Sequence, residues 1–355
     1  MIRSPLTITL LALALALAAC SPADPQATTS SALAEGVLLP AHATWKEADV
    51  ALAGSAKAFC AGQEDLASAR QAFLTAQSAW ASLQPLAVGP LAEGNRAWQV
   101  QFWPDKKNLV ARQVEALVKA KPQLAAADLE KASVVVQGLT AYEYLMFDPE
   151  IDLQNAEQKT RYCPLLVAIG EHQQALANTV LDQWQGENGA LALFRTFPNE
   201  RYAEANEAIS DMLRTQVSAI DGLKKKLGAP LGRQSKGVPQ PYQAEAWRSQ
   251  ASLSNLGAAL SGAEQLWHGA KDDGLQALLG SDQDDLKKRI DAAYAESRKQ
   301  LAGLQRPLGE LLADEHGRQT LNAFYDSLNV LHRLHEGELA RALGIQLGFN
   351  AHDGD

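Results

Sequence analysis

Glu143 is the residue whose surroundings in the sequence most need a chemical explanation. It lies in the stretch 134–149, VVVQGLTAYEYLMFDP, where nearly every neighbour is apolar. A helix without a polar face is typical of the centre of a domain. A carboxylate buried there is paired, protonated or kept for a function. Thr140 lies about one helical turn before Glu143, so the sequence predicts a hydroxyl beside a carboxyl group on one face.

Two histidines near the C-terminus are further candidate ligands. His332 and His335 follow the heptad spacing of the apolar residues in 317–343, which places both on the inward side of a helix. Glu336 is four residues after His332 and shares its side. Helical bundles build metal sites from glutamate and histidine on facing helices, so one interpretation is an iron or zinc site with Glu143, His332 and His335 as ligands. The alternative is that the histidines are partly exposed or hydrogen-bonded to neighbours.

No familiar catalytic signature accompanies these residues. The sequence contains no HExxH or HxxEH zinc motif, no P-loop, no GxSxG elbow and no CxxC pair. The formal net charge is −9, and no basic run is present. This balance disfavours nucleic acid as a partner. It fits cationic partners, metal ions among them, although most acidic proteins are merely soluble.

The first residues have the features of a secretion signal. Arg3 precedes the apolar run 10–17, which is too short to span a membrane, and small residues then lead to Cys20. This order is similar to a bacterial lipobox. The similarity implies that residues 1–19 are a signal peptide, that Cys20 is lipidated, and that the lipid anchors the protein in a membrane of the cell envelope. The expected location is the outer membrane, facing the periplasm; the alternative is an ordinary signal peptide with a chance cysteine. Residues 20–34 are rich in proline, serine and threonine, which predicts a flexible, lipidated tether.

Two further cysteines, Cys60 and Cys163, remain in the mature chain. The envelope is oxidising, so the two are a candidate disulfide. Two unrelated thiols are the alternative.

The rest of the chain predicts an all-α protein. Alanine, leucine, glutamine and glutamate dominate, and no stretch alternates for long with period two. Residues 228–241, rich in glycine and proline, form the longest break after the tether. We therefore expect an N-terminal helical bundle over 35–228 and a C-terminal bundle over 242–355. The predicted helices are 43–60, 64–84, 105–120, 123–147, 161–186, 200–227, 243–268, 281–302 and 317–343.

Three stretches together resemble the imelysin family, the M75 peptidases. They are the GxHxxE-like segment 138–143, the FWPDKKN of 102–108 and the GFNAHDGD of 348–355. The resemblance implies two similar up-and-down helical bundles packed together, with the GxHxxE site near where they meet. It also implies an envelope location and a link to iron or haem acquisition, and some relatives are described as metallopeptidases. In this chain the histidine position of the motif is Thr140, and a neutral hydroxyl is a poor ligand for zinc or iron.

Three functions follow from these observations. The first is a lipoprotein that binds iron, haem or a related ligand around Glu143 at the bundle interface. The second is a metal-dependent peptidase, and the third is a non-catalytic partner of an outer-membrane uptake receptor. Thr140 favours the first and third, because Glu143 alone cannot both hold a metal and act as base. The expected ligand-binding residues are Thr140, Glu143, Asp105, Asp353 and Asp355; the alternative for Asp105 is a cap on a helix that starts at Lys106.

Overall fold

The computed structural model describes residues 24–347, and within them every regular element is helical. The prediction of an all-α protein is therefore confirmed. Most long helices lie where the sequence predicts them, with shifts at their ends. The α-helices are α1 (Pro25–Leu33), α2 (Leu39–Cys60), α3 (Leu66–Leu83), α4 (Arg96–Val100), α5 (Leu109–Ala120), α6 (Ala126–Glu130), α7 (Leu139–Phe147), α8 (Ala156–Trp184), α9 (Ala190–Leu193), α10 (Ala205–Gly228), α11 (Ser252–His268), α12 (Asp284–Ala302), α13 (Leu308–Ala313), α14 (Glu315–Arg333) and α15 (Ala340–Ala342).

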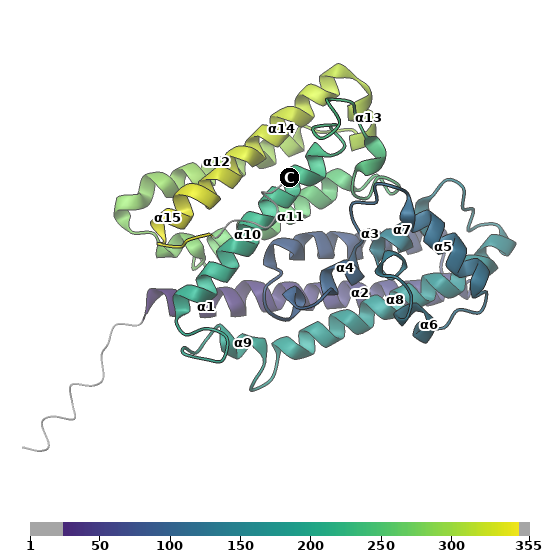
Figure 1. Ribbon diagram of the computed structural model, residues 1–355, viewed down its shortest axis with the longest axis horizontal. Coiled ribbons are helices and arrows are strands. Elements are labelled where there is room, and N and C mark those ends of the chain that lie inside the picture. The colour runs from purple at the N-terminus through teal and green to yellow at the C-terminus, as the bar shows by residue number, and fades with distance from the viewer. Residues whose placement is uncertain (1–23, 348–355) are drawn as a thin grey trace, which may run out of the picture.

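The long helices pack in layers (Figure 1). One bundle contains α2, α3 and α8, with α2 packed against both of the others. The other contains α10, α11, α12 and α14. The two bundles meet where α11 packs along α3, and one continuous hydrophobic core runs through both. The short helices α4 to α7 cover one end of the first bundle, and this end holds Glu143.

The N-terminal tether is shorter than predicted. Residues 25–33 form α1, which Asp24 caps by accepting a hydrogen bond from the backbone N–H of Gln26. A short π-helix, Ala34–Leu38, joins α1 to α2. Leu33 is fully buried, and α1 packs against α10. The proline at the start of α1 fits a first helical turn, where its missing N–H costs nothing. A composition typical of linkers thus misled the prediction.

The break at 228–241 does not divide the packing in two. Helix α10 precedes this break, yet it packs against α11 and α14, which follow it. The buried Gln216 of α10 donates hydrogen bonds to the Ala263 carbonyl of α11 and to the Tyr294 hydroxyl of α12. The last helix of the predicted N-terminal bundle over 35–228 therefore belongs to the second bundle.

The predicted helix 123–147 is broken into three pieces. Helix α6 ends at Glu130, a 3-10 turn covers Val134–Val136, and α7 starts only at Leu139. Gly138 marks the break, because a Cβ atom there would lie 2.4 Å from the Val100 carbonyl oxygen. This close approach of two backbones needs glycine. Helix α7 is nevertheless central, as predicted, with seven of its residues buried.

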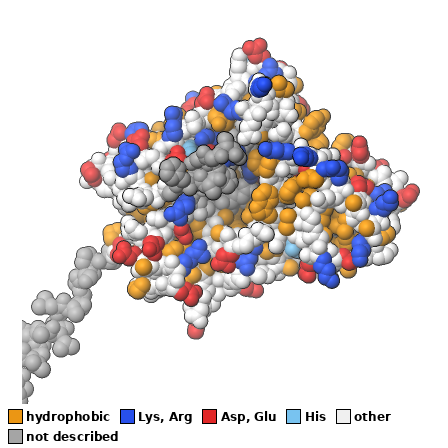
Figure 2. Space-filling model, in the orientation of Figure 1, with side chains coloured by type: hydrophobic (Ala, Val, Ile, Leu, Met, Phe, Trp, Pro, Cys, Tyr) orange, Lys and Arg blue, Asp and Glu red, His pale blue; other side chains and the backbone are white. Residues whose placement is uncertain are grey.

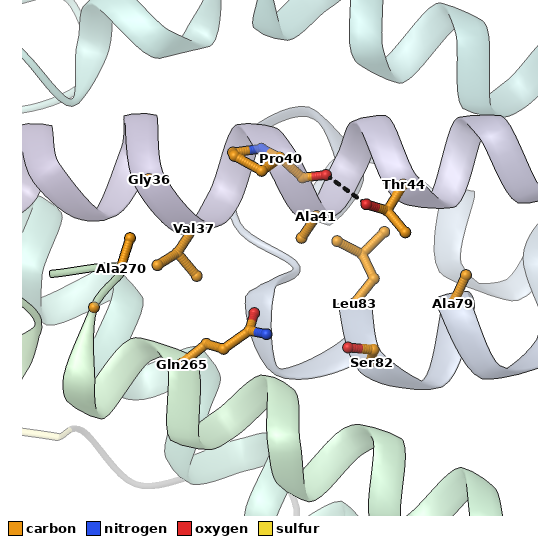
Figure 3. A pocket seen from close by; sticks show the side chains of 11 residues that line it. Gly36, Val37, Pro40, Ala41, Thr44, Ala79, Ser82, Leu83, Gln265 and Ala270 are labelled. Carbon is orange, nitrogen blue, oxygen red and sulfur yellow. Dashed lines mark hydrogen bonds between the residues drawn. The ribbon is translucent and has the colours of Figure 1, made fainter.

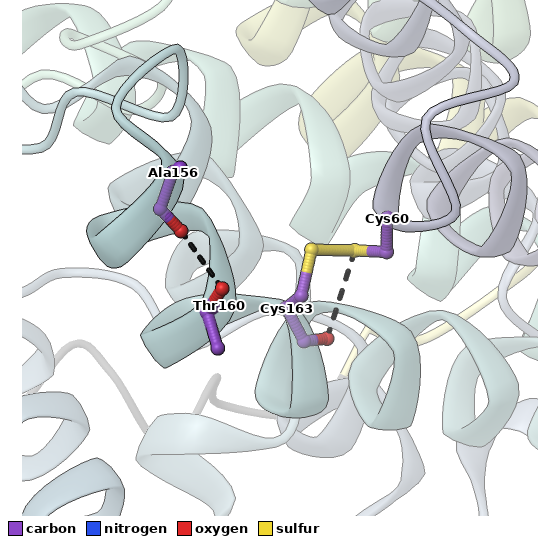
Figure 4. The surroundings of a disulfide bond; sticks show 4 residues. All are labelled: Cys60, Ala156, Thr160 and Cys163. Carbon is purple, nitrogen blue, oxygen red and sulfur yellow. Dashed lines mark hydrogen bonds between the residues drawn. A yellow bond between two sulfur atoms is a disulfide. The ribbon is translucent and has the colours of Figure 1, made fainter.

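Cys60 and Cys163 form a disulfide bond that ties the end of α2 to the first turns of α8 (Figure 4). Their Cα atoms are 5.7 Å apart, and 103 positions separate them in the sequence. The pairing proposed from the sequence is the one present in the structure.

Replacing both cysteines by serine is expected to lower the free energy of unfolding by about 2–4 kcal/mol, because the bond closes a long loop of the unfolded chain. Urea unfolding of the oxidised protein and the double variant measures this. Reductant should shift the wild-type midpoint towards that of the double variant and leave the variant unchanged. Equal midpoints for the oxidised wild type and the variant would contradict the prediction.

The described residues contain no helix long and apolar enough to cross a membrane. Acidic and basic side chains are scattered over the face shown in Figure 2, and apolar side chains gather towards the end where α3, α4 and α7 lie. The predicted signal peptide and Cys20 lie outside the described residues.

Candidate functional site

Glu143 lies on the central helix α7 and is almost completely buried, with 2% of its surface exposed. Ser249 holds its side chain: the Ser249 backbone N–H and the Ser249 hydroxyl each donate a hydrogen bond of 2.8 Å to Oε1 of Glu143. Ser249 is 106 residues away in the chain, on the segment that leads into α11. The site therefore joins the first bundle to the connection between the two bundles.

That connection, residues 241–250, is the part of the site that the sequence did not predict. A helix was expected from 243, but α11 begins only at Ser252. Ala246 and Gln250 have positive φ values of 53° and 58°, which non-glycine residues rarely adopt and a helix cannot contain. We call residues 241–250 the cover segment, because it lies over Glu143. The signal for it in the sequence was Trp247 and Arg248, a large aromatic and a cation a few residues after the break at 228–241.

A buried ion pair fixes one end of the cover segment. Nε of Arg248 lies 2.7 Å from Oδ2 of Asp148, at the C-terminal end of α7, and the two side chains are 3% and 10% exposed. Arg248 also donates to the side chain of Asn108 and stacks over the rings of Trp247 and Tyr144. A guanidinium can make these contacts at once because it is planar and carries five N–H donors.

A second buried pair fixes the middle of the segment. Nζ of Lys226, on α10, lies 2.5 Å from Oε1 of Glu245 and 2.6 Å from Oε1 of Gln84. The indole N–H of Trp103 donates to the Gln243 carbonyl at 3.2 Å. The cover segment is thus held by α7, by α10 and by the 101–108 stretch.

Thr140 and Asp105 both line the cavity at Glu143, as expected from the sequence. Each of them is already hydrogen-bonded to a backbone group. The Thr140 hydroxyl donates to the Phe102 carbonyl at 2.9 Å. Asp105 accepts from the backbone N–H groups of Leu109 and Val110 at 2.6 and 3.2 Å. It therefore caps α5, which starts at Leu109 rather than at Lys106.

These groups enclose a cavity of about 20 Å³. Its polar lining includes three carboxyl groups and a hydroxyl, and Trp103 and Trp247 form part of its wall. A volume of this size holds about one water molecule. Besides the two tryptophans, the polar side chains that line the cavity are Gln101, Asp105, Thr140, Tyr242, Glu143, Glu245 and Arg248.

Burial raises the pKa of Glu143, because loss of water penalises its charged form. The hydrogen bonds from Ser249 and the positive charge of Arg248 oppose this effect, and the nearby Glu245 adds to it. The net pKa is raised, so proton release from Glu143 is harder than from an exposed glutamate. A cation that binds this carboxylate must displace a proton more often than at an exposed site.

The predicted metal set of Glu143, His332 and His335 does not come together. Neither histidine lines the cavity around Glu143. His335 is fully buried in the second bundle: its Nδ1 lies 2.9 Å from the Leu331 carbonyl and its Nε2 lies 3.2 Å from the Tyr294 hydroxyl. Burial lowers the pKa of His335 to about 4, so its ring is neutral at pH 7.

His332 is also in the second bundle, with Nδ1 at 3.6 Å from Glu336, as its spacing predicted. Across residues 24–347, no three histidine, cysteine, aspartate or glutamate side chains are grouped so that they could hold a metal ion. Asp353 and Asp355, the other two expected ligands, lie outside the described residues.

A larger cavity of about 440 Å³ lies elsewhere at the bundle interface, between α2, α3 and α11 (Figure 3). Gln265 of α11 points towards Val37 of the π-helix and Leu83 of α3 across this space. Its lining carries no charged side chain. The 440 Å³ cavity is therefore neutral, whereas the cavity at Glu143 is charged and water-sized.

Two packed helical bundles, with a buried carboxylate site closed by the connection between them, define the class of this protein. A family model described as Imelysin, Peptidase_M75, matches residues 38–335. The chain belongs to the imelysin family, which confirms the resemblance seen in the sequence.

Known proteins agree with this assignment. Iron-regulated protein A of Synechococcus elongatus is 23% identical over 265 residues, which make up 72% of this chain and 68% of that protein. The crystal structure of an imelysin-like protein from Psychrobacter arcticum 273-4 has a TM-score of 0.78 at 21% identity, and the match covers 93% of this chain and 99% of that one. A protein described as an iron-regulated protein A precursor from Parabacteroides distasonis has a TM-score of 0.74 at 14% identity, over 92% and 97% of the two chains. At these identities the two solved structures establish the fold alone.

Proposed function

We propose that this protein is a binding component for iron in the cell envelope and that iron binds at the Glu143 site. The observation that carries the proposal is the buried Glu143 in a water-sized cavity that Asp105 and Glu245 also line. Because these three carboxyl groups do not form a metal site as they are arranged among the described residues, iron binding requires them to rearrange around Glu143. Carboxylate and hydroxyl oxygens are hard ligands that suit hard metal cations. The name of one relative, iron-regulated protein A of Synechococcus elongatus, supports a role connected with iron.

The size of the closed cavity bears on which form of iron binds. About 20 Å³ accommodates a single ion but not a macrocycle such as haem. The carboxyl groups also have partners: Ser249 binds Glu143, Lys226 binds Glu245, and the start of α5 binds Asp105. Iron entry therefore requires the cover segment to release Glu143. We favour an iron ion over haem as the ligand at this site.

The same geometry gives less support to a metallopeptidase. The lining of the cavity contains no imidazole, and Thr140 already donates its proton to a backbone carbonyl. Hydrolysis needs a metal ligand and a separate base. The two other carboxyl groups of the lining are already engaged, Asp105 by the start of α5 and Glu245 by Lys226. Capture of iron needs only the metal ligand.

Lipidation of Cys20 and an outer-membrane location facing the periplasm complete the proposal. Both rest on the sequence alone, since Cys20 lies outside the described residues. Mass spectrometry of the mature protein tests the anchor, and a mature chain with an unmodified cysteine would contradict it.

Glu143→Gln is expected to weaken binding of Fe²⁺ by about tenfold or more, because an amide oxygen is a weaker ligand than a carboxylate. The fold should persist, since the glutamine carbonyl can accept the two hydrogen bonds from Ser249. Anaerobic isothermal titration calorimetry measures the affinity. Wild-type affinity should also rise with pH through the raised pKa of Glu143, because deprotonation must precede binding. This pH dependence should be smaller in the variant.

Glu187→Gln is the matched control, because Glu187 is exposed in the loop after α8. It should bind Fe²⁺ as the wild type does. Equal affinity and equal pH dependence of the wild type and Glu143→Gln would exclude Glu143 as a ligand.

A further inference from the structure

The outer side of the cover segment forms a groove of about 300 Å³. Pro241, Tyr242 and Trp247 of the segment form one wall. The residues around the start of α13 form the other, with Pro307, Leu308 and Glu310 among them. A proline lies on each side of the groove, and the two aromatic rings lie on the cover-segment side, opposite Leu308.

The groove presents two hydrogen-bond donors without a protein acceptor. Tyr242 is 71% exposed, and its ring lies 4.9 Å from that of Trp247 in an edge-on arrangement. Within residues 24–347, neither the Tyr242 hydroxyl nor the Trp247 indole N–H makes a hydrogen bond. The guanidinium of Arg248 lies 4.3 Å from the Trp247 ring and supports it from behind. The Trp247 ring is therefore supported by Arg248, and both donors are available to a ligand.

This combination of groups fits an extended proline-rich chain. Such a chain adopts the polyproline II conformation, in which its carbonyls make no internal hydrogen bonds. Grooves lined by aromatic residues bind it by packing the proline rings between the aromatic side chains. Tyrosine hydroxyl and tryptophan N–H groups can then donate to the unpaired carbonyls. Because the ligand is already extended, little conformational entropy is lost on binding.

The charge at the edge of the groove selects among such chains. Glu310 is exposed, and it forms no ion pair with another residue in the part of the chain that the structure describes. The groove contains no cationic side chain. A basic residue between the prolines would complement Glu310, whereas an acidic one would be repelled.

We propose that this groove is the docking site for a proline-rich, lysine- or arginine-containing segment of a partner protein. The inference does not depend on which ligand binds at Glu143. It has a consequence for that site, because Tyr242, Ala244 and Trp247 line both the groove and the Glu143 cavity. A partner bound outside thus contacts the residues that close the cavity inside.

The test is titration of the full-length protein with three synthetic peptides, followed by tryptophan fluorescence and calorimetry. An alternating lysine–proline peptide should bind. Lysine–glycine and glutamate–proline peptides of equal length should have affinities lower by about tenfold or more. Tyr242→Ala should weaken binding of the lysine–proline peptide about tenfold, as expected for an aromatic anchor. Glu310→Gln should reduce the preference for lysine–proline over glutamate–proline.

Trp98→Ala is the control, because Trp98 is another exposed aromatic residue, with 47% exposure, and lies outside the groove. This variant should bind the lysine–proline peptide as the wild type does. Tyr242 is exposed, so its replacement should not disturb the fold, and circular dichroism verifies this. Failure of the lysine–proline peptide to bind, equal binding of the lysine–glycine peptide, or unchanged affinity in Tyr242→Ala would each overturn the proposal.

Discussion

Replacing Arg248 with alanine is expected to lower the free energy of unfolding by about 3–5 kcal/mol, because it leaves the buried carboxylate of Asp148 without its partner. The pair is separated by 2.7 Å and is almost fully removed from water. The substitution also removes the stacking on Trp247 and the hydrogen bond to Asn108. Denaturant unfolding followed by circular dichroism measures the loss.

Arg289→Ala is the control for this prediction. Arg289 donates two short hydrogen bonds to Glu338, of 2.7 and 2.6 Å. The geometry of this pair is therefore at least as good as that of Arg248 and Asp148. Both side chains are more than 40% exposed, and exposed pairs of this kind contribute about 0–1 kcal/mol. An equal loss of stability in the two variants would contradict the prediction that a buried ion pair is costlier to break than an exposed one.

Asp49→Asn is expected to make the protein more stable at neutral pH. Asp49 lies on α2, is fully buried, and neither of its carboxylate oxygens has a hydrogen-bond partner among the described residues. Burial raises the pKa of Asp49 well above its usual value. A raised folded pKa means that the native state binds the proton more tightly than the unfolded chain does. The ionisation of Asp49 therefore costs nothing at low pH and destabilises the fold increasingly as pH rises towards the folded pKa.

The expected result is a difference in stability that depends on pH. Below about pH 4, the usual pKa of an aspartate, Asp49→Asn and the wild type should be similar. Above it, the advantage of the variant should grow by about 1.4 kcal/mol for each pH unit until the folded pKa is reached. Unfolding curves across this range measure it, with the exposed Asp182→Asn as control. A constant difference between variant and wild type at every pH would contradict a raised pKa.

Local sequence pattern predicts most of the helices and the position of Glu143. The apolar stretch around Glu143 does form a buried helix, because apolar residues on all sides leave no face for water. The cysteine pair follows from the oxidising compartment that the first residues imply. The break at Gly138 was missed, because it depends on a contact with the backbone of Val100, which no local pattern reveals.

The cover segment could not be predicted for a related reason. The composition of 243–250 is compatible with a helix, and α11 does begin at Ser252. Contacts with other parts of the chain override that local preference: Ser249 binds Glu143, Glu245 binds Lys226 and Arg248 binds Asp148. Tertiary context of this kind regularly outweighs helix propensity, which differs by less than about 1 kcal/mol between most residues.

For the histidines, the sequence predicted burial correctly but did not predict the contacts. Their heptad spacing correctly places His332 and His335 inside the second bundle. Spacing along one helix does not say what the facing helix presents, and for His335 this is the Tyr294 hydroxyl rather than a second ligand. Inward-facing residues were predictable from the sequence, but their partners were not.

The most direct test of iron binding at Glu143 is a crystal structure of the protein grown with Fe²⁺, with diffraction recorded at the iron absorption edge. We expect an anomalous peak within bonding distance of the Glu143 carboxylate, together with displacement of Ser249 from Oε1. The same crystals of Glu143→Gln should lack that peak. Iron bound only at other positions in the wild type, with Glu143 still hydrogen-bonded to Ser249, would contradict the proposed site.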